Sequence, residues 1–169
     1  MKRTKFIVAL AALLAFALAP AQEKPSAEME RIAWMLGDWS GKVKWSIKGM
    51  NETVDMPYKA VMEGNFMKST SSFQMMGMSF SEMSYLCWDS AKKRYSSYTF
   101  TKFAPTPRIE HGTLEGDKMV MISEPWTVEG PMTSRATITK KSDKEVHFLI
   151  EFKEGDKWVK TAEGTFTKK

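Results

Sequence analysis

Methionine is the residue type with the clearest chemical potential in this chain, which contains 14 of them. Met75, Met76 and Met78 gather at one turn signal, with Met67 before them and Met83 after them. Thioether sulfur is a soft ligand that suits Cu(I), so copper binding is one interpretation. Methionine also fills irregular gaps and lines adaptable apolar pockets, and no histidine or cysteine joins this group. The pattern therefore favours packing or pocket lining, with Cu(I) binding as an alternative.

Histidine and cysteine offer little further chemistry. His111 and His147 lie far apart in the sequence and in no metal-ligand spacing, so we predict no metal site. The single cysteine, Cys87, has no partner for an internal disulfide and lies between Leu86 and Trp88 in an apolar run. We expect it to be a buried, inert thiol.

Catalytic motifs are missing from the sequence. It contains no G-x-S-x-G, no H-E-x-x-H and no phosphate-binding loop. Glu110 and His111 are adjacent, and neighbouring residues of a strand point to opposite faces, so they are not expected to act together. We therefore predict a protein that is not an enzyme. A hydrolase or isomerase that uses Glu82, His111 or Glu151 in a pocket is the alternative.

Arg135 is the remaining candidate for specific recognition. It lies among small polar residues in the segment 133–137. On an inner face its guanidinium would be a fixed cation for a carboxylate ligand or a buried glutamate. On an outer face it would be surface charge, and strand parity alone leaves both readings open.

Regularly spaced turn signals mark the elements that must position these residues. Nine of them divide residues 39–166 into ten segments, each about long enough for one strand. Evenly spaced short strands, without a helix long enough for a crossover, indicate an antiparallel barrel or sandwich. The signals are Gly49-Met50-Asn51, Gly64-Asn65, Gly77, Asp89-Ser90, Pro105 to Pro107, Gly116-Asp117, Gly130-Pro131, Ser142-Asp143 and Gly155-Asp156.

Side-chain alternation indicates which faces are buried. Every second residue of the first and ninth segments is apolar, which predicts one buried face and one wet face. The last segment alternates in the same way, with Trp158 on the expected inner face, but Lys160 interrupts it. In the middle, Glu82 and Ser84 share a face with Leu86. Buried polar groups are costly in a filled core, so this mixture suggests a partly wet cavity.

The N-terminal residues predict export. A basic start is followed by an apolar run and by small residues, the layout of a signal peptide covering 1–21 and cleaved after Ala21. We therefore expect a periplasmic or secreted protein without a membrane anchor. Residues 22–33 are expected to be a linker and the start of a short helix over 27–35 with Ser26 as its N-cap, and 34–169 the barrel.

Charge gives no reason to expect a nucleic-acid partner. The chain has 25 basic and 20 acidic residues, and three basic ones lie in the expected signal peptide, which leaves a net charge of +2. The remaining lysines are scattered and form no basic block. The sequence carries no signal that sets the oligomeric state.

Several short motifs resemble one bacterial family. Met35-Leu36-Gly37-Asp38-Trp39-Ser40-Gly41 is similar to the opening strand of calycin-type barrels, in which a Gly-x-Trp places an indole at the closed end. Together with Trp88-Asp89, Lys93-Arg94-Tyr95, Gly112-x-Leu114, Arg135 and the stretch from Gly155 to Lys168, it resembles the uncharacterised lipocalin-like family DUF1579.

The resemblance implies a ten-stranded antiparallel up-and-down barrel, akin to fatty-acid-binding proteins and nitrobindins, with a short N-terminal helix. It also implies a structural group of Gly37, Trp39 and Lys168, with the lysine over the indole. Nitrobindin-like barrels hold haem through a histidine in the final strand. The corresponding strand here contains none, so we expect no haem and no other cofactor.

A small apolar or amphipathic molecule bound inside the barrel is the function that we predict. A structural or protein-interaction module with a filled barrel is the alternative, and a cavity of about 300 Å³ or more favours ligand binding over it. The residues expected to line the site are Trp45, Phe73, Met75, Tyr85, Tyr98, Met121 and Arg135.

Overall fold

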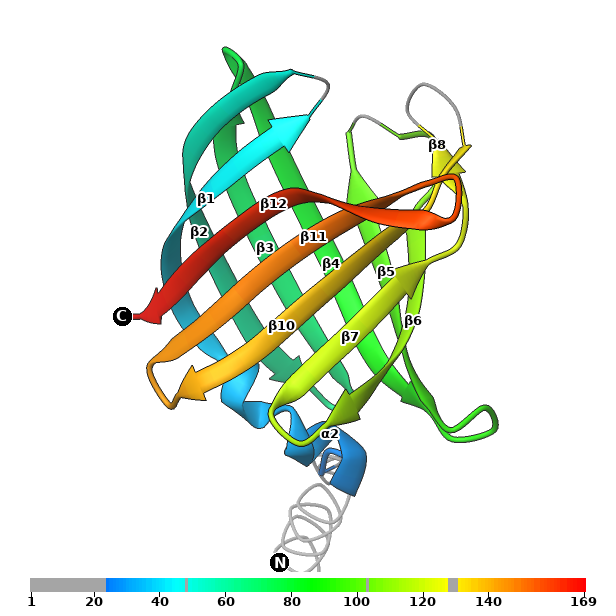
Figure 1. Ribbon diagram of the computed structural model, residues 1–169. Coiled ribbons are helices and arrows are strands. Elements are labelled where there is room, and N and C mark those ends of the chain that lie inside the picture. The colour runs from blue at the N-terminus through cyan, green and yellow to red at the C-terminus, as the bar shows by residue number, and fades with distance from the viewer. Residues whose placement is uncertain (1–23, 48, 103, 128–130) are drawn as a thin grey trace, which may run out of the picture.

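The protein is a closed barrel of ten antiparallel strands with one short helix near its N-terminus, as predicted (Figure 1). The computed structural model describes residues 24–47, 49–102, 104–127 and 131–169. Around the barrel the strand order is β1-β12-β11-β10-β7-β6-β5-β4-β3-β2. Each barrel strand therefore pairs with its neighbour in the chain, and β1 with β12 closes the ring. The expected signal peptide, 1–21, lies outside the described residues.

Turn residues set the strand boundaries. The β3–β4 and β11–β12 hairpins turn at Gly77 and Gly155, which both adopt positive φ angles that favour glycine. The elements are α2 (Ala27–Arg31), a 3₁₀ turn (Ala33–Met35), β1 (Gly37–Ile47), β2 (Met50–Glu63), β3 (Phe66–Met75), β4 (Met78–Asp89), β5 (Arg94–Thr101), β6 (Arg108–Glu115), β7 (Lys118–Ser123), β8 (Trp126–Thr127), β9 (Pro131–Met132), β10 (Ser134–Ser142), β11 (Glu145–Glu154) and β12 (Lys157–Lys168). The short pair β8–β9 lies between β7 and β10 in the chain and forms a separate two-stranded sheet.

The helix covers one end of the barrel. As predicted, Ser26 caps it, because its side chain accepts a hydrogen bond from the backbone N–H of Met29. Met29 and Ile32 are fully buried against Tyr95, whose hydroxyl donates to the carbonyl of Glu28 over 2.7 Å. So short a helix is marginal alone, and this packing holds it in place. Among the described residues, no helix is long and apolar enough to cross a membrane.

Where β1 meets β12, Gly37, Trp39 and Lys168 form one structural group. The indole N–H of Trp39 donates to the carbonyl of Met35 over 3.0 Å, and Lys168 Nζ lies 5.2 Å from the centre of the indole ring. Gly37 has a φ of 120°, and a Cβ there would come within 2.6 Å of Lys168 Cε. The positive φ therefore favours glycine, and a side chain at this position would also displace the end of Lys168 beside the indole.

The last strand differs from the alternation that its sequence predicts. A register shift beside Ile150 places Val159, rather than Trp158, in the barrel lining. The prediction that Trp158 faces inward is wrong, because the extra residue in β12, Thr161, reverses the faces of the residues before it relative to those after it. Trp158 instead lies under the guanidinium of Arg135, whose carbon is 4.6 Å from the ring centre. The same shift explains why Lys160 interrupts the apolar pattern.

Candidate functional site: the interior cavity

The barrel encloses a cavity of about 880 Å³. Its lining runs from Trp39, near the helix, to Ile47 and Trp126 at the other end of the barrel. The volume exceeds the roughly 300 Å³ that separates a ligand cavity from a filled core.

One wall of the cavity is apolar. The rings of Phe73 and Phe80 stack with their centres 5.3 Å apart, and those of Phe148 and Phe166 meet edge to face at 5.9 Å. Such pairs hold aromatic side chains in fixed positions. This wall comprises Trp45, Met56, Phe73, Met75, Phe80, Phe148, Ile150 and Phe166, mainly from β1 to β3, β11 and β12.

The other wall is polar and is formed mainly by β4, β5 and β6. It contains Glu82, Ser84, Ser97, Thr99, Arg108 and Glu110. The strand register makes these residues neighbours, because Thr99 lies opposite both Ser84 and Arg108 on its two sides, and Ser97 lies opposite Glu110. The hydroxyls of Ser84 and Thr99 are hydrogen-bonded over 2.8 Å. These six polar groups thus form one continuous patch, while further polar residues of the lining, among them Ser134, Lys153 and Thr161, lie on β10 to β12.

Arg108 is the centre of this polar wall. Its Nε lies 3.4 Å from a carboxylate oxygen of Glu110, and its Nη1 lies 3.9 Å from one of Glu82. Its guanidinium carbon is 5.3 Å from the ring centre of Trp126. Glu110 is only 6% exposed, so the guanidinium provides the opposite charge that a buried carboxylate needs.

Three N–H donors of the cavity lining make no hydrogen bond among the described residues: Nε of Arg108, whose 3.4 Å approach to Glu110 is an ion pair without a hydrogen bond, and Nε1 of both Trp45 and Trp126. Buried donors without partners are uncommon in folded proteins and cost free energy. Tyr58 adds a buried hydroxyl to the lining, and burial raises its pKa. The phenol is therefore held in its neutral form.

Four of the seven residues predicted to line the site do so: Trp45, Phe73, Met75 and Met121. For Tyr85, Tyr98 and Arg135 the prediction is wrong. Their neighbours along each strand, among them Ser84, Ser97 and Ala136, line the cavity, so these three side chains point outward.

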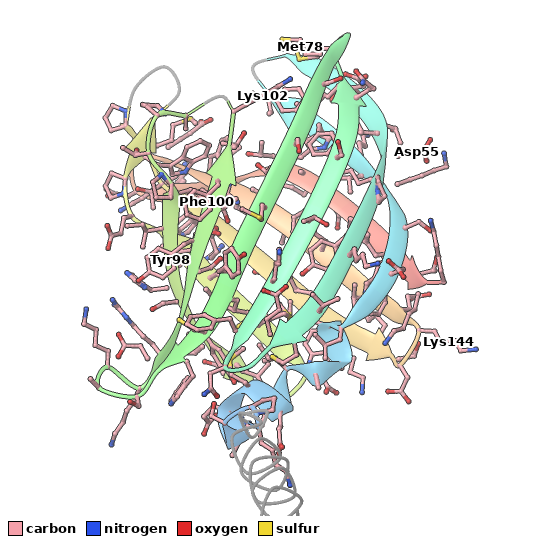
Figure 2. The ribbon with its side chains drawn as sticks, turned by 180° about the vertical axis from the view of Figure 1, so that it is seen from behind. Asp55, Met78, Tyr98, Phe100, Lys102 and Lys144 are labelled. Atoms are coloured by element: carbon pink, nitrogen blue, oxygen red, sulfur yellow. The ribbon has the colours of Figure 1, made fainter. Side chains whose placement is uncertain are left out.

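The outward residues have partners of their own. Tyr98 is 39% exposed on the outside of β5 (Figure 2). The ring of Tyr85 faces Lys68, whose Nζ lies 5.8 Å from the ring centre. Arg135 Nε donates to Glu151 over 2.6 Å. The interior arginine is thus Arg108, which sequence reasoning left without a role.

The signal for the polar wall was present in the sequence. Arg108 and Glu110 are two residues apart, so they share a face of β6, and Glu82 and Ser84 interrupt an otherwise apolar face of β4. The register that brings the three together could not be derived from spacing alone. Trp126 carries no such signal, because its position depends on the short β8–β9 pair.

The histidines lie outside the cavity. His111 is bonded on the outer face to Ser96 through Nδ1 and to Glu124 through Nε2, each over 3.0 Å. It therefore points away from its neighbour Glu110, as strand parity predicts. Of the groups considered for an enzyme, Glu82 lines the cavity, whereas His111 and Glu151 do not.

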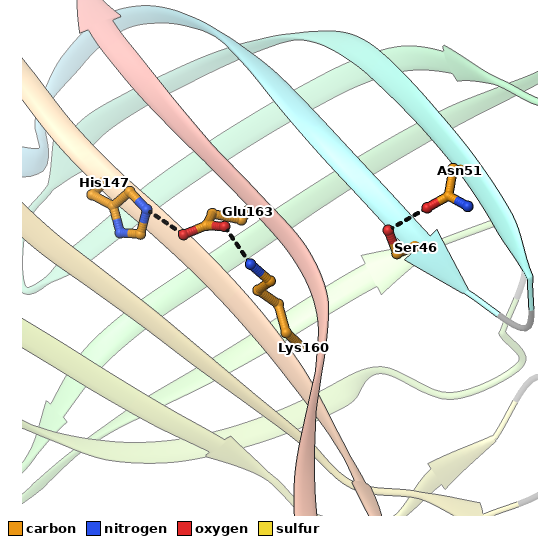
Figure 3. A network of polar contacts seen from close by, with 5 residues as sticks. All are labelled: Ser46, Asn51, His147, Lys160 and Glu163. Atoms are coloured by element: carbon orange, nitrogen blue, oxygen red, sulfur yellow. Dashed lines mark hydrogen bonds and ion pairs between the residues drawn. The ribbon is translucent and has the colours of Figure 1, made fainter.

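His147 belongs to a second outer-face network (Figure 3). Its Nε2 lies 3.1 Å from Glu163, which also accepts a hydrogen bond from Lys160 over 2.7 Å. Lys160, and then His147, lower the pKa of the Glu163 carboxyl. The described residues contain no group of three or more histidine, cysteine, aspartate or glutamate side chains that could hold a metal ion.

The methionine cluster separates in the folded chain. Met67 and Met75 line the cavity, Met76 and Met78 are about half exposed at the β3–β4 turn, and Met83 lies on the outer face. This distribution gives the thioethers no common direction and matches the packing interpretation better than a copper site. Cys87 also faces outward and is half-buried, and burial raises the pKa of its thiol.

Comparison with known proteins agrees with this architecture. The family model described as "Protein of unknown function (DUF1579)" matches residues 24–168. The chain belongs to this family. No curated protein matches the sequence.

A solved structure that resembles this DUF1579 protein shows its fold. The crystal structure of Rv2717c from M. tuberculosis is similar with a TM-score of 0.64 at 11% identity, over 86% of this chain and 99% of that chain. A redesigned β-barrel, b11L5F_LGL, matches with a TM-score of 0.47 at 11% identity, over 81% of this chain and 93% of that one.

Proposed function

We propose that this DUF1579 protein binds a small amphipathic molecule inside its barrel. The observation that carries the proposal is the cavity of about 880 Å³ with one apolar and one polar wall. Ligand sites in proteins have volumes of roughly 300–1,000 Å³, are mostly apolar and carry a few polar groups that fix orientation. A molecule with one polar end matches both walls at once.

The energetics of the barrel support the same proposal. Protein interiors are normally close-packed, and empty space loses dispersion contacts. A bound molecule restores those contacts along the apolar wall. It also supplies acceptors near the N–H groups of Trp45 and Trp126, which have none among the described residues. A purely structural barrel gains nothing from leaving this volume open.

We also propose that the protein works outside the cytoplasm and without haem. The proposal rests on the signal-like residues 1–21 and on the absence of histidine from the sequence of the last strand, Lys157–Lys168. N-terminal sequencing of protein from the exported fraction of its native host tests the first part. We expect it to begin at Gln22, and recovery of the full chain from the cytoplasm would contradict it.

Fluorescence of the uncharged probe phenylnaphthylamine tests the binding function. We expect its emission to rise when it is mixed with the protein, because the apolar wall excludes water. In Ala136→Phe a large ring enters the cavity, and we expect affinity to fall at least about tenfold, a loss of about 1.4 kcal/mol. Ala136 lines the cavity, whereas Ile122 is 43% exposed on the outer face.

Ile122→Phe is therefore the matched control, since it adds a ring on the outer face of β7, the strand that pairs with β10. Affinity should stay close to that of the unchanged protein. If both variants bind the probe equally well, the probe is not inside the barrel and the proposed function is wrong.

A further inference from the structure

The charges of the polar wall do not cancel. One guanidinium, that of Arg108, faces the carboxylates of Glu82 and Glu110 at 3.9 and 3.4 Å. By formal charge the cluster carries one negative charge in excess. The cation is already shared between two anions, so it is not available as an isolated partner for a third.

This arrangement discriminates among possible polar ends of a ligand. A carboxylate beside Arg108 would stand next to two other carboxylates, and like charges in a site of low dielectric repel strongly. An ammonium group would be attracted to the carboxylate of Glu82 but repelled by the guanidinium of Arg108. An uncharged polar group is repelled neither by the carboxylates nor by the guanidinium.

The hydrogen-bonding groups of the wall suit an uncharged partner as well. The Nε1–H of Trp126 and the Nε–H of Arg108 make no hydrogen bond among the described residues, while the oxygens of Glu82 and Glu110 accept only. The hydroxyls of Ser84 and Thr99 can do both. A group that both accepts and donates, such as a hydroxyl or a primary amide, complements all of them.

We propose that the ligand is an uncharged amphipath whose polar end lies against Arg108, Glu82 and Trp126 and whose apolar part lies along the opposite wall. This inference rests on the proposed function and assigns the ligand's chemical class. The expected order of affinity for one alkyl chain is therefore a hydroxylated or amide end group first, an ammonium second and a carboxylate last.

Displacement of phenylnaphthylamine by three compounds with a straight chain of ten carbons tests this order. They are decanoylglycerol, decylamine and decanoic acid, each used at neutral pH below the concentration at which it forms micelles. We expect decanoylglycerol to displace the probe at a concentration at least about fivefold below that of decanoic acid, a difference of about 1 kcal/mol. Tightest binding by decanoic acid would overturn the inference.

Glu82→Gln tests whether the wall causes the order. It keeps the shape of the side chain and removes one carboxylate, so decanoic acid should gain about tenfold relative to decanoylglycerol. Glu151→Gln is the control, because it makes the same change in net charge on the outer face, where Glu151 accepts from Arg135. An equal gain in both variants would overturn the inference, since it would come from overall charge.

The outcomes separate this inference from the proposed function. If the probe does not bind in the barrel at all, the proposed function fails. If the probe binds and none of the three compounds displaces it, or if decanoic acid is strongest, cavity binding stands and the assigned ligand class is wrong.

Discussion

The covered end of the barrel and its hollow part are built from the same strands but are packed in opposite ways. Strand β5 shows the contrast over a few residues. Tyr95, at the helix end, is fully buried against Met29 and Ile32. Ser97 and Thr99, further along the same face, are nearly as buried but point toward the cavity. The strand thus contributes a packed side chain at one end and polar cavity-lining side chains at the other.

This difference separates the end of the barrel that carries much of its stability from the part in which we propose that a ligand binds. Large apolar side chains fill the covered end, so removing one leaves an unfilled hole. In the hollow part much of the lining already faces open space, so a small change there costs less free energy of unfolding. Substitutions at the covered end and in the hollow part test this difference, because each variant's free energy of unfolding can be compared.

Tyr95→Ala is expected to have the largest effect. It removes the largest fully buried side chain, its bond to Glu28 and its edge-to-face contact with Trp88, at 5.0 Å between ring centres. The free energy of unfolding should fall by about 3–5 kcal/mol in a denaturant titration. Tyr98→Ala, on the outer face of the same strand, is the control and should cost about 1 kcal/mol or less. Equal losses would break the comparison.

Gly37→Ala should be next. The φ of 120° is strained for alanine, and the added Cβ would meet Lys168 Cε, so we expect a loss of about 1–3 kcal/mol. Gly77 also has a positive φ, but nothing lies within 4 Å of a Cβ there. Gly77→Ala should therefore cost clearly less in thermal unfolding. A Gly37 variant no less stable than the Gly77 variant would show that the contact with Lys168 is dispensable.

Thr99→Val probes the polar wall with almost no change of shape. It deletes the hydrogen bond to Ser84 and leaves that hydroxyl without this partner, which should cost about 0.5–1.5 kcal/mol. Chemical denaturation should be used to compare the free energies of unfolding of Thr99→Val and Tyr95→Ala, because both changes lie on β5. A loss as large as that of Tyr95→Ala would place the stability of the barrel in its hollow part as well.

Alkaline pH should produce the smallest effect. Burial raises the pKa of Tyr58, which packs against apolar side chains of the covered end and of the apolar wall, so folding favours its neutral form. Its contribution to stability is complete below the pKa of an unfolded tyrosine and is lost as the pH rises through the raised value. Burial also raises the pKa of Tyr95, so absorbance of the phenolate should show two late-titrating groups, and Tyr58→Phe should remove one of them. If both groups persist in the variant, the assignment to Tyr58 is wrong.

The sequence predicts the architecture well but the site only in part. Turn residues and alternation were sufficient for the ten strands, because both are local properties of the chain. The inward faces of β1 and β11 followed for the same reason. Arg135 and Tyr98 were misplaced because face assignment in the middle strands depends on register, and polar groups occur there on both sides. Trp158 was misplaced by a bulge that only Lys160 hinted at.

Methyl NMR of the methionines, with phenylnaphthylamine as ligand, tests the central claim most directly, because the aromatic probe shifts the signals of methyl groups close to it. Met56, Met75 and Met121 line the cavity, whereas Met29 is sealed at the covered end and Met83 lies on the outer face. We predict large shifts at the first three and small ones at Met29 and Met83. Shifts confined to Met83, with the cavity signals unchanged, would contradict a binding site inside the barrel.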